Sequence, residues 1–325
     1  MIKSNNKIII IGTLPPPIGG VSIYNQRLYD FLQNEEDTEV DFIDYKRKGL
    51  ADIVGAIIGH SIIYLNCSSA SFKFFVTLIA ALFGKKTVVT FHGSMSRHSG
   101  IADILDKLVL RLASLSIVLN KRSFDHAVKY TRKVFHGTAF IPPIKQETLN
   151  NDIKTFLAHC REKYKLICSC NAHNVSFDNA GNEIYQVKFL LEIFRELPDC
   201  CIILSDPSGM YSSYLEKQKA SLPSNVFIIK ETHSYFELLK ETDVMLRITT
   251  TDGDSISVRE ALYLHKTVIA SNVVDRPAGV ITVNISKEEI LKKLREVANG
   301  ITPPHVDHEE NGGKQILKIF ASLQR

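Results

Sequence analysis

Short apolar runs that are typical of buried strands alternate with helical patterns along almost the whole chain. The runs are rich in β-branched residues, and the helical stretches carry apolar residues three or four positions apart. This alternation is typical of parallel sheets with helices on their faces, because parallel strands need a crossover connection. The sequence therefore predicts an α/β fold with doubly wound parallel sheets. The expected strands lie at 8–11, 40–43, 61–65, 87–91, 116–119, 166–170, 201–204, 226–229, 243–248 and 267–270, and the expected helices at 21–32, 51–58, 71–83, 101–113, 185–197, 211–220 and 235–241.

A proline pair at 142–143 divides this pattern into two halves. A chain of 325 residues is long enough for two domains. The charge balance also changes here, because residues 1–145 hold 18 Lys and Arg against 11 Asp and Glu, whereas residues 146–325 hold 21 against 24. We therefore expect one domain at 1–145 and a second at 146–305, followed by a helical pattern near the end of the chain.

The second half contains a turn that is suited to bind an anion. The strand at 243–248 runs into small polar residues and then into a helix, which begins near Ser255. The first amides of a helix have no partner within it, and the helix dipole places about half a positive charge there. Asp252 and Glu260 flank this position, where their carboxylates are placed for hydroxyls and not for phosphate. The turn therefore predicts a ligand with sugars on both sides of a diphosphate.

This segment resembles the donor-binding segment of the retaining GT-B glycosyltransferases of the family 4 type. The shared features are two acidic residues eight positions apart, Asp252 and Glu260, and the strand Lys-Thr-Val-Ile-Ala-Ser that follows at 266–271. The resemblance implies that Asp252 is a catalytic residue that holds the transferred sugar. It also implies that Glu260 holds the ribose of the nucleotide.

The resemblance further implies that the turn between the two acids binds the donor diphosphate, through Gly253, Asp254, Ser255 and Ile256. Two features depart from the family pattern. The first acid is usually Glu and here is Asp252, and Asp254 and Ser255 stand where the family usually has an aromatic residue and a glycine. These departures leave the identity of the donor sugar open.

The resemblance covers nearly the whole chain and implies the GT-B architecture, in which two doubly wound, Rossmann-like domains face each other. Residues 1–145 would then form the acceptor-binding domain, and residues 146–305 the nucleotide-sugar-binding domain. The C-terminal segment, 306–325, would form a helix that packs back on the first domain.

Two other interpretations of the turn stay open. Ser257 and Glu260 have the spacing of a capping box, in which Ser caps the helix and Glu reaches back to its first N–H. Asp252-Gly253-Asp254 has the form of an Asp-x-Asp metal motif or of part of a calcium loop, although a calcium loop needs Gly at its sixth position and a bidentate acid at its twelfth. We expect no metal site.

A glycine-rich loop follows the first strand and contains Gly19 and Gly20. A strand, a glycine loop and a helix start together form a second geometry that can bind anions. The loop matches neither Gly-x-Gly-x-x-Gly nor the P-loop motif, and a plain tight turn explains it equally well. It resembles the Pro-x-x-Gly-Gly loop of the same family, which implies that Gly19 and Gly20 let the backbone approach the donor phosphates and the acceptor.

His92 directly follows the strand at 87–91, at an edge where such sheets place their ligands. A single histidine often has a structural role, and this interpretation stays open. The pair His92-Gly93 resembles the family motif after its fourth strand. The resemblance implies that His92 is a catalytic residue that contacts the reacting sugar or the acceptor.

One family feature is missing from the second domain. The family usually has Gly-Arg and then Lys after the first strand of this domain, whereas here an uncharged loop follows Cys170. Arg247 is the best substitute, because it ends the strand before the binding turn and would place a guanidinium beside the diphosphate. Arg276 is a weaker candidate, and either arginine could instead form a surface ion pair.

Basic residues are concentrated in the first half, where residues 46–145 hold 15 Lys and Arg against 4 Asp and Glu. We expect Lys46–Lys48 and the basic residues at 121–133 to hold this domain against an anionic membrane surface, with 72–83 close by. A merely solvated basic face is the alternative. No nucleic-acid recognition motif accompanies the charge, so we expect no nucleic-acid partner.

The chain shows no secretory signal and no apolar stretch of the ~20 residues that a membrane-spanning helix needs. Its six cysteines form no Cys-x-x-Cys pair and are expected to be reduced. These features predict a cytoplasmic protein that binds peripherally to the inner face of the cell membrane.

Together, these features predict a retaining, metal-independent glycosyltransferase without a cofactor. It would move a sugar from a nucleotide diphosphate sugar to a sugar hydroxyl of a glycan acceptor linked to a lipid pyrophosphate, in bacterial O-antigen, capsule or exopolysaccharide assembly. A nucleotide-sugar 2-epimerase of GT-B type is the enzymatic alternative. The missing Gly-Arg and Lys also leave open a non-catalytic scaffold subunit.

Overall fold

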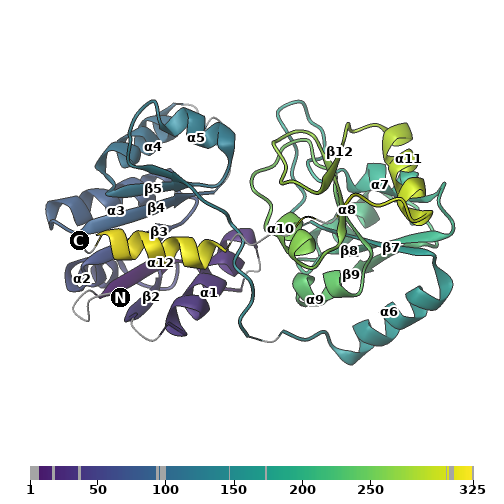
Figure 1. Cartoon of the computed structure of the whole chain (residues 1–325), viewed down its shortest axis with the longest axis horizontal. Coiled ribbons are helices and arrows are strands. Elements are labelled where there is room, and N and C mark those ends of the chain that lie inside the picture. Colours follow the sequence, from purple (N-terminus) through teal and green to yellow (C-terminus); the bar gives the residue numbers. More distant parts are fainter. Residues whose placement is uncertain are drawn as a thin grey trace. The chain divides into compact units, whose positions relative to one another are not determined.

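The computed structural model describes residues 7–16, 19–35, 38–92, 95, 100–145, 147–172, 174–304, 306 and 311–323. The chain divides into two compact units, which we call unit 1 (Met1–Lys145 with Glu310–Arg325) and unit 2 (Gln146–Glu309). Each unit is built on one six-stranded sheet with helices packed on it (Figure 1). The α/β fold with two Rossmann-like parallel sheets, predicted from the alternating pattern, is confirmed.

Unit 1 has the strand order β2-β1-β3-β4-β5-β6, with all pairs parallel. Every residue of β1 and β3 is buried, because these apolar runs are covered on both faces of the sheet. The strand β6 was not among the expected elements, since three residues are too few to show a strand period. The elements are β1 (Ile8–Gly12), α1 (Gly20–Gln33), β2 (Val40–Asp44), α2 (Leu50–Gly59), β3 (Ile62–Asn66), α3 (Ala70–Leu82), β4 (Lys86–Phe91), α4 (Ile101–Leu112), β5 (Leu115–Val118), α5 (Lys121–Ala127), β6 (Val134–His136) and α12 (Gly312–Leu323).

Unit 2 has the strand order β12-β11-β10-β7-β8-β9, again with all pairs parallel. The expected elements do not include α6, β12 or α11. The elements are α6 (Asn151–Lys163), β7 (Leu166–Asn171), α7 (Val187–Phe194), β8 (Cys200–Ser205), α8 (Met210–Lys217), β9 (Val226–Ile229), α9 (Tyr235–Lys240), β10 (Val244–Arg247), α10 (Ile256–Tyr263), β11 (Thr267–Ser271), β12 (Val280–Val283) and α11 (Lys287–Ala298).

The sheet of unit 2 separates two hydrophobic cores, because successive strand residues point to opposite faces. Leu166, Cys168 and Cys170 of β7 pack with α7, α8 and α11 on one face, whereas Ile167 packs with α6 and α9 on the other. All six cysteines are buried and free, five of them in these cores and Cys67 in the core of unit 1. Within the described residues, no helix is both long and apolar enough to span a membrane.

The strand order reverses direction next to the first strand of each unit. In unit 1, β1 lies between β2 and β3, and in unit 2, β7 lies between β10 and β8. At such a switch point the connections leave toward opposite faces, so that a crevice opens at the carboxyl ends of the strands. The topology therefore points to the ends of β1 and β3 in one unit and of β7 and β10 in the other.

The C-terminal helix α12 packs on α1 and completes unit 1. Phe320 of α12 is fully buried, and its ring lies edge-on to Tyr64 of β3 with 5.9 Å between the ring centroids. A Cβ atom at Gly313 would lie 2.7 Å from the ring of Phe31 in α1, so that only glycine permits this close approach.

The basic residues of unit 1 divide between the two edges of its sheet. Because the strands are parallel, segments that follow strands share the carboxyl edge. Lys46–Lys48 follow β2 and residues 121–122 open α5 after β5, whereas residues 129–133 precede β6 and residues 85–86 lie at the start of β4. The basic residues at 121–122 and at 129–133 therefore lie toward different edges of the sheet, whereas the expected contact with a membrane stays a prediction.

Candidate functional site

The expected donor-binding turn lies at the carboxyl edge of the sheet of unit 2. β10 ends at Arg247, and the loop that follows leads into α10, while the neighbouring strand β7 ends at Asn171. A small pocket at this edge is lined by residues that include Asn171, Tyr185, Arg247 and Thr249. The turn thus occupies the switch point at which open α/β sheets bind their ligands.

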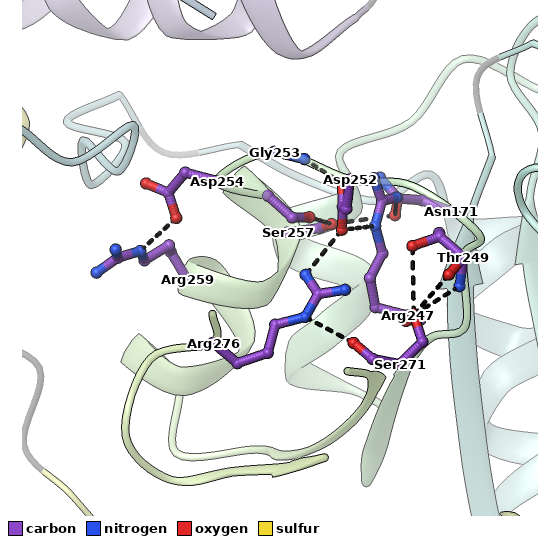
Figure 2. A network of polar contacts seen from close by, with 11 residues as sticks. Asn171, Arg247, Thr249, Asp252, Gly253, Asp254, Ser257, Arg259, Ser271 and Arg276 are labelled. Atoms are coloured by element: carbon purple, nitrogen blue, oxygen red, sulfur yellow. Dashed lines mark hydrogen bonds and ion pairs between the residues drawn. The ribbon is translucent and has the colours of Figure 1, made fainter. Parts of the chain in front are cut away.

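Two arginines converge on Asp252, as Figure 2 shows. Arg247 donates from Nε to Oδ2 of Asp252 at 3.0 Å and from Nη2 to Oδ1 at 2.9 Å, and Arg276 donates from Nη1 to Oδ2 at 2.8 Å. The side chains are 12%, 6% and 3% exposed for Arg247, Asp252 and Arg276. We call these three residues the Arg-Asp-Arg cluster. It joins the loops that follow the adjacent strands β10 and β11.

In the Arg-Asp-Arg cluster, two guanidinium groups share one carboxylate, so that the three side chains together carry one net positive charge. Burial alone would raise the pKa of Asp252, but Arg247 and Arg276 outweigh it and lower that pKa from 3.8 to about 2. Burial would likewise lower the pKa of Arg247, but the carboxylate of Asp252 raises it. The carboxylate of Asp252 and the guanidinium group of Arg247 are therefore charged at neutral pH.

Acidification is expected to remove the stabilising effect of Asp252. A carboxyl whose pKa is lower in the folded state stabilises the fold above its unfolded pKa, and this effect is lost as the pH falls through the folded pKa. The lowering from 3.8 to about 2 corresponds to about 2 kcal/mol. Melting curves by circular dichroism are expected to show a stability difference between wild type and Asp252→Asn that is largest above about pH 5 and shrinks toward pH 2.

The control for this experiment is Asp275→Asn, which changes an exposed carboxyl next to Arg276. We expect no comparable change of stability with pH in this variant. A stability difference between wild type and Asp252→Asn that stays constant from pH 7 to pH 2 would contradict the assigned pKa of Asp252.

The structure gives Arg247 a different partner from the expected diphosphate. Besides binding Asp252, its guanidinium lies 5.0 Å from the ring centroid of Tyr185, and its Nη1 donates to Oδ1 of Asn171 at 3.5 Å. Arg276, the weaker candidate from the sequence, is the more deeply buried of the two arginines. Its Nη2 is buried and has no hydrogen-bond partner among the described residues.

Asp254 pairs with an arginine of the helix that follows. Nε of Arg259 donates to Oδ1 of Asp254 at 2.8 Å, and the side chain of Asp254 is 6% exposed. Both carboxylates of the Asp252-Gly253-Asp254 sequence are thus held by guanidinium groups. Among the described residues, no group of three or more His, Cys, Asp or Glu side chains could hold a metal ion.

The N-terminus of α10 is open toward the loop. Ser255 is the N-cap residue, but its side chain makes no capping hydrogen bond, and its Oγ instead lies 3.0 Å from Oγ of Ser257. In the described part of the chain, the amides of Ile256, Ser257 and Val258 have no hydrogen-bond partner. Three donors at the positive end of the helix are therefore available to an anion.

The capping-box interpretation of Ser257 and Glu260 is wrong. The helix begins one residue before Ser257, whose Oγ donates to Oδ1 of Asn171 at 3.1 Å. Glu260 is the fifth residue of α10, beyond the position from which a side chain can reach back to the N-cap. The side chain of Glu260 is nonetheless buried, with the residue only 4% exposed.

In unit 1, the structure places the predicted residues at the carboxyl edge of the sheet. Gly19 is the N-cap residue of α1 and Gly20 its first residue, and the N–H of Gly19 donates to Oγ of Ser22 at 3.0 Å. His92 is half-buried, and its ring lies edge-on to Tyr24 with 5.3 Å between the centroids. Gly93 and Ser94, which complete the His-Gly motif, lie outside the described residues.

Asp252 and Gly253 thus lie together with Asp254, Ser255 and Ile256 in one loop and helix start, as expected. Asn171 and Tyr185, which contact Arg247, were not among the predicted site residues. Asn171 could have been found from its place, since a polar residue ends an apolar strand there. No local signal points to Tyr185, because a long loop separates it from that strand.

Comparison with known proteins identifies the fold. No family model matches the chain, and no curated protein matches its sequence. HepE of Anabaena in complex with UDP and glucose is 14% identical with a TM-score of 0.69, covering 98% of this chain and all of HepE (100%). UDP-GlcNAc 2-epimerase of Neisseria meningitidis bound to UDP-GlcNAc is 13% identical (TM-score 0.60, coverage 97% and 100%). Sucrose-phosphate synthase of Thermosynechococcus elongatus is 12% identical (TM-score 0.63, coverage 98% and 99%). The chain therefore has the GT-B type of fold, with two Rossmann-like domains.

Proposed function

We propose that the protein is a glycosyltransferase that uses a nucleotide diphosphate sugar as donor. In this proposal it transfers the sugar with retention and without a metal to a sugar hydroxyl of a lipid-linked glycan, in the assembly of a bacterial surface polysaccharide. The observation that carries the proposal is the Arg-Asp-Arg cluster beside the open N-terminus of α10. Two guanidinium groups and one carboxylate leave one positive charge at a helix end that already favours anions.

Several features support a diphosphate at this place. Nη2 of Arg276 is a buried donor without a partner in the described chain, and an unsatisfied buried donor costs about 1–3 kcal/mol. A phosphate oxygen could accept from it and from the first amides of α10. The neighbours in the fold comparison also support a nucleotide ligand, because HepE was solved with UDP and with UDP-glucose.

In the proposal, Glu260 binds the ribose hydroxyls, and Asp252 has a role other than direct contact with the sugar. Both oxygens of Asp252 already accept hydrogen bonds from guanidinium groups, which are charge-assisted and therefore strong. Asp252 then orients Arg247 and Arg276 toward the diphosphate. Gly253, Asp254, Ser255 and Ile256 shape the loop, while Gly19, Gly20 and His92 of unit 1 bind the sugar or the acceptor.

A turnover assay tests this function directly. The purified protein is incubated with a panel of radiolabelled nucleotide sugars, with and without a lipid-linked glycan acceptor, in excess chelator. We expect transfer of label to the acceptor from one donor, at the same rate with and without chelator. Loss of transfer in chelator, with recovery on adding manganese, would contradict the metal-independent mechanism.

A nucleotide-sugar 2-epimerase is the second candidate, because the same fold occurs in the N. meningitidis enzyme bound to UDP-GlcNAc. The two functions differ in their need for an acceptor. An epimerase converts UDP-GlcNAc in the absence of any acceptor, and NMR of the incubated nucleotide sugar detects the change at C2. Nucleotide binding without transfer or epimerisation would instead support a non-catalytic scaffold.

The carboxyl edge of unit 1 is the proposed contact with an anionic membrane surface. Lys46, Arg47 and Lys48 are exposed there, and Leu50 (59% exposed) and Ile101 (76% exposed) lie at the helix starts on the same edge. Exposed apolar side chains with basic residues beside them suit the boundary between lipid headgroups and acyl chains. This edge also carries His92, so that a membrane-bound acceptor would approach the same side of the unit.

Reversing the charge of Lys46, Arg47 and Lys48 to Glu is expected to weaken binding to phosphatidylglycerol vesicles. Each basic residue near an anionic surface contributes about 1 kcal/mol, and the attraction falls with salt because the Debye length shrinks from ~10 Å at 0.1 M to ~3 Å at 1 M. Sedimentation with anionic and neutral vesicles measures the effect. The control reverses Lys154, Lys163 and Lys217, which are exposed on unit 2. Equal binding to both vesicle types at every salt concentration would contradict the membrane contact.

A further inference from the structure

A chain of polar groups crosses the switch point of unit 1 and ends at His92. Asn25 of α1 and Asn66, the last residue of β3, are both completely buried, and His92 directly follows β4. Nδ2 of Asn25 lies 3.0 Å from the main-chain oxygen of Thr13, in the segment after β1. Nδ2 of Asn66 lies 2.6 Å from Oδ1 of Asn25, and Oδ1 of Asn66 is hydrogen-bonded to Nε2 of His92.

The direction of every hydrogen bond in this chain follows from its first member. The main-chain oxygen of Thr13 can only accept, so the amide nitrogen of Asn25 must face it. Oδ1 of Asn25 therefore accepts from Nδ2 of Asn66, which leaves Oδ1 of Asn66 facing His92. A carbonyl oxygen at that place can only accept, so Nε2 of His92 must carry the hydrogen.

We propose that Asn25 and Asn66 are positioning residues that hold His92 as the Nε2–H tautomer, so that its Nδ1 accepts a hydrogen bond from a sugar hydroxyl. This inference rests on the proposed function for the identity of the ligand. The tautomer itself follows from the hydrogen bonds of unit 1.

The surroundings of His92 keep its ring neutral. Burial and, to a smaller extent, the positive charge of Lys73 in α3 together lower the pKa of His92 to about 4. Lys73 is itself paired with Asp106 of α4 at 2.7 Å, and the aromatic ring of Tyr24 covers His92 from α1. The third contact is the neutral amide of Asn66 on β3. Among the described residues, no hydrogen bond or ion pair joins His92 to a carboxylate that would stabilise an imidazolium.

A neutral imidazole of this tautomer selects the chemistry of its ligand. The lone pair of Nδ1 accepts a hydrogen atom from a hydroxyl group, but it repels the oxygens of a phosphate. Unit 1 is thereby assigned a hydroxyl-bearing group at His92. The anionic diphosphate is assigned to the arginines and helix start of unit 2.

Gly12 at the end of β1 is part of the same arrangement. A Cβ atom at Gly12 would lie 2.5 Å from Nδ2 of Asn25, closer than real Cβ contacts, so that a side chain there would displace the asparagine. Gly12→Ala is therefore expected to perturb the hydrogen bond between Nδ2 of Asn25 and the main-chain oxygen of Thr13, while His92 itself is left unchanged. This variant separates the positioning role from direct contact with the ligand.

The test is the tautomer of His92, measured by two-bond 1H–15N correlation NMR on protein with 15N-labelled histidine. His92→Gln identifies the signals. We expect the neutral Nε2–H form in the wild type at pH 7, and a mixture of tautomers in Asn66→Ala and Gly12→Ala.

Asn66→Asp places a carboxylate beside the ring and is expected to raise the pKa of His92 by about 1–3 units. Asn34→Asp, an exposed change just after α1, is the control and should leave the spectrum unchanged.

Two results would overturn the proposal. One is a wild-type His92 that is protonated at Nδ1, or on both nitrogens, at pH 7. The other is a tautomer that stays the same in Asn66→Ala and Gly12→Ala. The measurement needs no substrate, so an inactive protein with the expected tautomer would refute only the proposed function.

If transfer is found, we expect Asn66→Asp to lower kcat about tenfold or more while leaving the affinity for UDP unchanged. The kcat of this variant should also depend on pH near the raised pKa of His92.

Discussion

Replacing Asp106 by alanine is expected to destabilise unit 1 by about 3–5 kcal/mol, because it leaves a buried ammonium group without a counter-charge. Nζ of Lys73 in α3 lies 2.7 Å from Oδ1 of Asp106 in α4, and both side chains are nearly inaccessible, at 5% and 4% exposed. Nζ also lies 4.1 Å from the ring centroid of Phe91, at the end of β4. The ion pair therefore joins two helices directly beneath the strand that leads to His92.

Hydrogen exchange measured by mass spectrometry suits this prediction, because it reports on unit 1 separately from unit 2. The amides of α3 and α4 should lose roughly 100- to 4,000-fold of their protection in Asp106→Ala, since each 1.4 kcal/mol corresponds to a factor of ten. The double variant Lys73→Met with Asp106→Leu removes both charges and is expected to recover most of the stability. Unchanged protection in Asp106→Ala would show that the buried ammonium group of Lys73 does not need this carboxylate as its counter-charge, and would contradict the prediction.

Replacing Glu260 by glutamine is expected to weaken the binding of UDP by about 10- to 100-fold. A hydrogen bond to a charged group contributes about 1.5–3 kcal/mol, and the amide keeps the shape of the side chain while removing its charge. Titration calorimetry measures the affinity, and melting curves measure stability alongside it. Because Glu260 does not cap α10, we expect the melting temperature to change much less than the affinity.

The matched control is Glu241→Gln, which changes an exposed glutamate at the end of the adjacent helix α9. This variant should bind UDP like the wild type. If Glu260→Gln keeps the wild-type affinity but melts at a much lower temperature, the buried carboxylate has a structural role, and the proposed ribose contact is refuted.

The arginines of unit 2 show how the structure changes the expected division of roles. The resemblance assigns Asp252 to the sugar and leaves the diphosphate without its usual basic residues. In the structure, Asp252 forms ion pairs with both Arg247 and Arg276. In the proposed function, these two arginines supply the charge of the missing Gly-Arg and Lys, Arg247 from the end of β10 and Arg276 from the loop after β11.

The sequence by itself determined most of the strands and helices and the place of the turn between β10 and α10. These features depend on local properties of the sequence. A two-residue or 3.6-residue period indicates which face of a strand or helix is buried, and a polar turn before a helix indicates an open helix end. For this reason β1, β10 and α10 lie close to their expected residues. The elements that escaped prediction include β6, which is too short for a period to develop.

Only the tertiary structure decided which side chains meet. Arg276 reaches Asp252, 24 positions away, because β10 and β11 are parallel neighbours whose following loops share one edge. Asn25 reaches Asn66, 41 positions away, because β1 and β3 pair directly and α1 returns along them. Such pairings depend on strand order and register, which no local pattern encodes. The same reason applies to the basic residues of unit 1, whose division between two edges follows from the direction of the strands and not from their spacing in the chain.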